Sequence, residues 1–125
     1  MPRHPTVLLR HDTPAGLHYD WLMTDPNDVA GKLWTARVDV PSFQWQELAC
    51  FDAEPTFAHR RKYLTFQGEL SGNRGRVRRI DQGFADPQLW TASRIVVHIN
   101  MNHFAGTIQL CKQSDVLWRA TRLAV

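Results

Sequence analysis

Short runs of β-branched and aromatic residues recur along the chain, and each run is closed by Gly, Pro, Asp or Asn. Apolar and polar side chains alternate within these runs, which predicts half-buried β-strands rather than helices. The predicted strands cover residues 6–11, 17–23, 32–40, 63–70, 74–80, 93–101, 106–112 and 116–125. About eight strands separated by turn residues are typical of an antiparallel sandwich or barrel.

Two segments break the alternation. Pro41 and Ser42 can open a short helix in the segment 41–55, and residues 86–93 can form a single turn. Neither segment is long enough to make an α/β protein, and no repeat or linker divides the chain. We therefore predict an all-β fold for residues 1–125, a single domain built as a small closed antiparallel barrel with one or two short helices.

Charge and cysteine content bear on which partners and which cellular compartment we expect. The formal net charge of +3 favours an anionic partner without identifying it. No apolar run approaches the roughly 20 residues of a membrane span, so we expect no membrane partner. Cys50 and Cys111 form no CxxC pair, and no apolar export segment opens the sequence. We therefore expect reduced thiols in a cytoplasmic protein.

The stretch RHDTPAGLHYDWLM, residues 10–23, carries the first candidate chemistry. Side chains alternate along a strand, so His18 and Asp20 project from one face while Tyr19 projects from the other. The Pro-Gly turn between the strands can bring His11 to the same face. Two imidazoles and a carboxylate are a plausible ligand set for Mn²⁺, Zn²⁺ or Fe²⁺, although strand histidines are also common as plain surface or core residues.

Two basic segments carry the second candidate chemistry. In HRRKYLTF an imidazole, His59, stands beside three cations and is followed by Tyr63, which would suit a phosphate group. In RGRVRRI the alternation places Arg74, Arg76 and Arg78 on one face of a strand, where they could follow a nucleic-acid backbone. A solvated basic strand edge is the competing interpretation of both segments.

The order of these motifs, RHDTPAGLHYDWLM, then HRRKYLTFQGEL, then GRVRRIDQG, resembles the phosphoesterase domain of bacterial DNA ligase D. The resemblance runs from Val7 to Gly83 and continues less specifically into the closing strands, with no ligase or polymerase domain attached. It implies a β-barrel that binds Mn²⁺ in a groove and trims DNA 3′ ends in repair by non-homologous end joining. The reactions implied are removal of a terminal ribonucleoside and then of a 3′-phosphate.

The resemblance also assigns roles to residues. It implies His11, His18 and Asp20 as ligands of a divalent metal, with Mn²⁺ expected and Zn²⁺ or Co²⁺ as alternatives. It places His59 and Tyr63 beside the scissile phosphate. The residues expected to bind phosphate or nucleic acid are Arg60, Arg61, Arg74, Arg76 and Arg78. The partners implied are DNA 3′ ends, including ends with terminal ribonucleotides, and separately encoded ligase and polymerase proteins.

Two positions depart from the family pattern. Leu22 stands where the family has a phosphate-clamping arginine, and Gln67 stands where glutamate is expected. The resemblance also expects an arginine before the second His motif, and residues 50–59 contain none. Arg10, Arg37 and Arg61 are candidates to replace that arginine in space. These departures leave open a second function, in which the same fold is a catalytically degenerate module that binds DNA ends or repair proteins.

Overall fold

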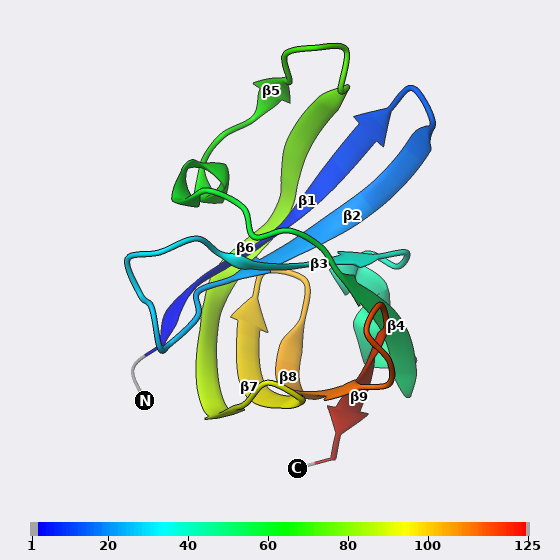
Figure 1. Cartoon of the computed structure of the whole chain (residues 1–125). Helices are drawn as coiled ribbons and strands as arrows, with labels where there is room; N and C mark the ends of the chain where they lie inside the picture. The colour runs from blue at the N-terminus through cyan, green and yellow to red at the C-terminus, as the bar shows by residue number, and fades with distance from the viewer. Residues whose placement is uncertain (1–2, 125) are drawn as a thin grey trace.

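The computed structural model describes residues 3–124, which form nine β-strands and two short 3₁₀ helices (Figure 1). The strands are β1 (His4–Thr13), β2 (Gly16–Met23), β3 (Trp34–Val38), β4 (Cys50–Pro55), β5 (Gly68–Glu69), β6 (Arg76–Trp90), β7 (Arg94–Met101), β8 (Ala105–Lys112) and β9 (Trp118–Leu123). The 3₁₀ helices are η1 (Ser42–Glu47) and η2 (Arg61–Leu64).

Strand β1 closes the sheet, because it pairs with β2 on one side and with β6 on the other. The ring runs β1-β2-β3-β4-β9-β8-β7-β6, and all neighbouring strands are antiparallel. The short β5 lies outside the ring and pairs with the start of β6. The prediction of a small antiparallel barrel of about eight strands with one or two short helices is confirmed. Closure also removes the exposed edges that an open sheet would present.

Two sequence-based expectations about local structure were wrong because strand pairing overrides local pattern. The short helix predicted to open at Pro41 and Ser42 is confirmed as η1, but residues 50–55 of the same segment, predicted to break the strand pattern, form β4 between β3 and β9. Phe51 and Ala53 are turned into the core. Residues 86–90, expected to form a turn, continue β6 along β7. The register shifts between Pro87 and Leu89, and a bulge of this kind tolerates a proline inside a strand.

The predicted strand over residues 63–70 was also wrong. Tyr63 and Leu64 belong to η2, and within this segment only Gly68 and Glu69 pair with another strand. The cause is a second apolar surface outside the barrel. Tyr63 and Leu64 pack against it, and a 3₁₀ turn places both side chains on that surface where an extended strand would alternate them.

The side chains of β1 and β2 alternate between two apolar clusters. Leu8 and Trp21 point into the barrel and belong to its main core. Leu9 and Leu22 point outward and form the outer cluster, which also contains Val7 and Leu33 and is covered by η2. In Figure 1 the chain that follows β4 passes in front of β1 and β2 before it reaches η2. The outer face of the β1–β2 hairpin is thus covered by residues far away in sequence.

Two observations bear on the expected environment. Cys50 and Cys111 are free thiols, as their spacing predicted. None of the helical segments in residues 3–124 has the length and apolar character that crossing a membrane requires.

A buried carboxylate joins the ends of the barrel strands. Asp81 of β6 is only 2% exposed and accepts a hydrogen bond from the Ser42 hydroxyl at the start of η1 (2.5 Å). It also accepts backbone N–H groups of Asn102 (2.9 Å) and His103 (3.2 Å), in the turn between β7 and β8. Buried carboxylates persist only when donors satisfy their oxygens. Asp81 therefore holds η1 and the β7–β8 turn against β6.

We expect Asp81→Ala to lower the free energy of unfolding by about 3 kcal/mol, because it leaves several buried donors unpaired and hydrogen bonds to charged groups contribute roughly 1.5–3 kcal/mol each. Urea denaturation measures the change. The control is Asp115→Ala, at a fully exposed side chain 3.7 Å from the Lys112 ammonium, with an expected change within about 0.5 kcal/mol. Equal losses in the two variants would contradict the bracing role of Asp81.

Candidate metal centre

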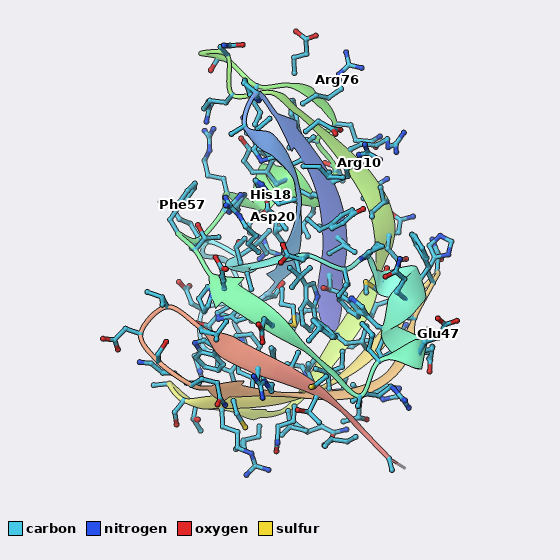
Figure 2. The ribbon with its side chains drawn as sticks, turned by 90° about the vertical axis from the view of Figure 1, so that its right-hand side faces the viewer. Arg10, His18, Asp20, Glu47, Phe57 and Arg76 are labelled. Atoms are coloured by element: carbon cyan, nitrogen blue, oxygen red, sulfur yellow. The ribbon has the colours of Figure 1, made fainter. Side chains whose placement is uncertain are left out.

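Three candidate ligands meet on the outer face of the β1–β2 hairpin. His11 lies directly opposite His18 in the antiparallel register, and Asp20 is two residues farther along the same strand, opposite Leu9. Side chains directly opposite and diagonal to one another on one face of a sheet are close enough to interact. Figure 2 shows His18 and Asp20 next to each other on β2. The register thus brings these side chains, the His–His–Asp cluster, together as the sequence predicted.

The distances within this cluster fit one divalent ion. His11 Nδ1 is 3.2 Å from His18 Nε2 and 3.7 Å from Asp20 Oδ2, and His18 Nε2 is 3.4 Å from that oxygen. Nitrogen and oxygen ligands bind a metal such as Zn²⁺ at about 2.0–2.2 Å, and at that length neighbouring ligands are separated by roughly 3.0–3.4 Å. The cluster is also sheltered, with side-chain exposures of 16%, 12% and 5%.

A backbone carbonyl fixes the orientation of the first ligand. His11 Nε2 lies 2.8 Å from the carbonyl oxygen of Arg74, which can only accept a hydrogen bond. The neutral ring therefore carries its proton on Nε2, and the Nδ1 lone pair faces the other two ligands. Gly75 permits this contact, because its φ is +95° and a Cβ there would overlap the Asp12 carbonyl.

The second ligand is kept neutral. Burial lowers the pKa of His18 below its usual 6.5, and the charges of Arg37 and His11 lower it further, while Asp20 opposes the shift. Near neutral pH the ring is therefore neutral, and a neutral imidazole can bind a metal. His11 Nδ1, His18 Nε2 and the Asp20 carboxylate converge on one point, where they repel each other unless a proton or a cation lies among them. The donor set accordingly fits a divalent cation.

The cluster forms part of the wall of a groove of about 880 Å³. The floor comes from β1 and β2, and the opposite wall from the chain that crosses them after β4. The backbone N–H of His59 donates to the Leu33 carbonyl (3.1 Å), and the N–H of Leu33 donates back to His59 (2.7 Å). This isolated bridge holds the crossing segment in place.

His59 is oriented by two aromatic neighbours. Its ring lies parallel to that of Phe57 (4° between planes, centroids 5.1 Å apart) and edge-on to Tyr63 (5.5 Å). Its Nδ1 is 3.1 Å from the Phe57 carbonyl oxygen, so the neutral ring is protonated at Nδ1 and Nε2 is left as the atom that can exchange a proton. His59 and Tyr63, which the family resemblance places beside the scissile phosphate, both line the groove.

Only two of the five arginines expected at the site line the groove. Arg60 and Arg74 line the groove, whereas Arg61, Arg76 and Arg78 do not. Arg76 and Arg78 lie outside the groove because β6 contains a bulge. Leu8 pairs with Asp81, but the next residue of β1, Leu9, pairs with Arg79. The extra residue sets Val77 opposite His11 and turns both arginines to the other face.

Of the three arginines named from the sequence as replacements for a missing arginine, Arg37 is the one that lies beside the His–His–Asp cluster. It lies opposite Asp20 in the β2–β3 register and lines the groove. Within residues 3–124 it forms no ion pair, although Asp39 and Glu54 line the same groove. Arg10 instead pairs with Asp12 on the opposite face (3.1 Å).

The two departures from the family pattern have structural roles. Leu22 is fully buried in the outer cluster and does not reach the groove. The side-chain oxygen of Gln67 accepts the backbone N–H of Arg79 (2.9 Å), and the Arg79 guanidinium donates to the Leu64 carbonyl (2.8 Å). Gln67 therefore ties the η2 segment to β6.

Lys32 and Phe57 also line the groove, but they are not among the site residues predicted from the sequence. Lys32 precedes β3, and its position carries no local signal. Phe57 stands two residues before His59, and its exposure of 78% cannot be read from the chain. Arg37 could be placed beside Asp20 from the sequence only if the pairing of β3 with β2 were already known.

We expect His18→Ala to abolish stabilisation by Mn²⁺ or Zn²⁺ and to change the metal-free stability by less than about 1 kcal/mol, because His18 belongs to neither apolar cluster. In the unaltered protein, metal at a hundred times its Kd should raise the unfolding free energy by about 2.7 kcal/mol. Urea titrations with and without metal measure both. The matched control is His98→Ala on the exposed face of β7, which should keep the full response. A metal response retained without His18 would exclude this cluster.

We expect metal-free stability to fall as the pH drops below about 6.5, because the lowered pKa of folded His18 means that the unfolded chain binds the proton more tightly. Protons also compete with metal for the imidazoles, so stabilisation by Mn²⁺ should disappear over the same range. Urea titrations from pH 8 to pH 5 measure both effects. His18→Ala should flatten this part of the metal-free profile, and an unchanged slope in that variant would contradict the assignment.

Comparison with known proteins adds no assignment. A scan against protein-family models and a search of curated proteins found no match to this chain. The groove itself combines three converging ligands, the His59 imidazole and several cations.

Proposed function

We propose that this chain is a metal-dependent phosphoesterase that processes nucleic-acid 3′ ends, removing a 3′-phosphate or a terminal ribonucleoside during DNA end repair. The observation that carries the proposal is the position of the His–His–Asp cluster in one groove with His59 and with the arginine side chains of Arg37 and Arg60. Metal ligands, a proton-exchanging imidazole and cations are the groups that hydrolysis of a phosphate ester needs.

His11, His18 and Asp20 would hold the ion. Mixed imidazole and carboxylate ligands suit Mn²⁺, our expected metal, and also Zn²⁺ and Co²⁺. When bound, the metal supplies Lewis-acid polarisation of a phosphoryl oxygen. Three protein ligands leave further coordination positions for substrate, as in catalytic rather than structural metal sites.

The cations of the groove would bind the phosphate. Arg37 offers a planar fork beside Asp20, and Arg60 lies on the opposite wall next to His59. Guanidinium groups bind phosphate oxygens through paired, charge-assisted hydrogen bonds, which fixes the orientation of the ester. The carboxylates of Asp39 and Glu54 in the same groove limit its net charge, so binding would be selective for a positioned phosphate rather than for any polyanion.

His59 would act on the leaving oxygen. Its Nδ1–H is held by the Phe57 carbonyl, so the proton that exchanges with the groove is on Nε2. A water molecule would bond to phosphorus as the ester P–O bond breaks, and Nε2 of the protonated ring can donate its proton to the leaving oxygen. That oxygen becomes the 3′-hydroxyl of the DNA when a phosphate is removed, and the 5′-hydroxyl of the released nucleoside when a ribonucleoside is removed. Tyr63 packs edge-on against the ring and is a positioning residue in this scheme.

One observation favours the alternative of a binding module without turnover. The position two residues after Asp20, which carries a clamping arginine in the ligase D domain, is Leu22 in this chain, and Leu22 is buried beneath η2. A groove that kept its metal and cations but positioned the phosphate poorly would bind 3′ ends without hydrolysing them. Salt-sensitive DNA binding is common to both functions, so only turnover separates them.

The test is incubation of the purified chain and Mn²⁺ with primers that end in a 3′-phosphate or a terminal ribonucleotide. We expect His59→Ala to reduce kcat by about 100-fold, the lower range of general acid catalysis. We expect Arg37→Ala to raise KM by about tenfold, through loss of a charge-assisted contact. Arg119→Ala on β9, 50% exposed and paired with Asp52 at 3.7 Å, is the matched control and should be neutral.

Absence of product at every Mn²⁺, Zn²⁺ and Co²⁺ concentration would reject the enzyme. If the same protein still bound these primers in a salt-dependent manner, the binding module would stand in its place. Turnover that was indifferent to His59→Ala would reject its role at the leaving oxygen.

A further inference from the structure

Phe57 is the most exposed phenylalanine among the described residues, at 78%. It lies on the crossing segment after β4 and lines the same groove as the His–His–Asp cluster. Figure 2 shows its side chain at the edge of the molecule, on the same side as His18 and Asp20. Transfer of a phenyl ring from an apolar environment to water is unfavourable, so a ring left exposed at the rim of a groove is available to pack against a ligand.

The ring of Phe57 is held in a fixed orientation. One face lies against the imidazole of His59, with only 4° between the planes, and the Phe57 carbonyl accepts the imidazole Nδ1–H. The backbone at His59 is fixed in turn by its two hydrogen bonds to Leu33. With an exposure of 78%, the remaining face of the ring is open to solvent. Phe57 therefore presents a flat, preorganised apolar surface beside the cluster.

The surroundings of this surface match a nucleotide. Arg60 and Lys32 line the same groove and supply positive charge for a phosphate. Proteins that bind single strands combine such a cationic groove with aromatic rings on which bases stack, because every nucleobase has a planar face. The groove volume of about 880 Å³ lies in the range of small-ligand pockets, roughly 300–1,000 Å³, and suits part of one strand rather than a duplex.

We propose that Phe57 is a stacking subsite for the unpaired nucleobase of the 3′-terminal nucleotide. This inference rests on the proposed function and names its substrate more closely: a single-stranded or frayed 3′ end. The base stacks on the free face of Phe57 while its phosphate lies among the cations beside the His–His–Asp cluster. A paired terminal base must first leave its partner, so duplex ends bind less tightly than single strands.

The experiment compares two single-stranded oligonucleotides that differ only at the 3′-terminal nucleotide, one with its base and one with an abasic analogue. Fluorescence anisotropy in EDTA measures their binding to the full chain without turnover. We expect the base to improve affinity about tenfold, in line with base–aromatic stacking. Phe57→Ala should bind both oligonucleotides equally, and Phe57→Trp should restore the ratio. The matched control is Phe43→Ala in η1, at another exposed phenylalanine (59%) outside the groove, which should keep the ratio.

Weaker binding of the abasic oligonucleotide by Phe57→Ala would reveal a disturbance of His59, because this oligonucleotide keeps the phosphates but lacks the terminal base. A ratio unchanged in Phe57→Ala overturns the stacking subsite, as does failure of the unaltered chain to bind either oligonucleotide. Hydrolysis of bis(p-nitrophenyl) phosphate with Mn²⁺, an ester without a nucleobase, tests the phosphoesterase separately. Hydrolysis without a base effect would remove the subsite and leave the enzyme, whereas a base effect without any hydrolysis would leave binding alone.

Discussion

The antiparallel pairing of β1 between β2 and β6 is the constraint on which the rest of this structure depends. It closes the ring, and its register sends Leu8 and Trp21 inward while His11 and His18 face outward. A slip of one residue would exchange these sets and bury the ligands in the barrel. The same hydrogen bonds that fix the core therefore fix the candidate metal centre, at no additional cost in backbone conformation.

The position of the site outside the barrel follows from the two-sided character of the hairpin. A sheet face that carries Leu9 and Leu22 must be covered, and Tyr63 and Leu64 of η2 cover it. The segment leading to η2 then passes over the ligand-bearing end of the hairpin and brings His59 and Phe57 to face it. Apolar packing at one end thus assembles a polar groove at the other.

The electrostatics of the groove are organised around mutual repulsion that a cation can relieve. Arg74 and Gly75 hold the His11 ring with its lone pair facing the cluster, and burial keeps His18 neutral. A carboxylate, Asp20, meets them within 3.7 Å. Arg37 beside Asp20 and Arg60 on the opposite wall would receive an anionic group. A divalent ion and a phosphate ester complement this arrangement of charges, and this complementarity is the physical basis of the proposed function.

By itself the sequence determined the all-β class, the barrel, the outward face shared by His18 and Asp20, and the approach of His11. All of these follow from local alternation and turn chemistry, which act between neighbours in the chain. Tertiary structure alone decided the placement of the arginines. Arg37 reaches the site because β3 pairs with β2, and a one-residue bulge in β6 turns Arg76 and Arg78 away from it. Cross-strand register and a crossing segment depend on contacts between distant residues, so the local pattern carries no signal for them.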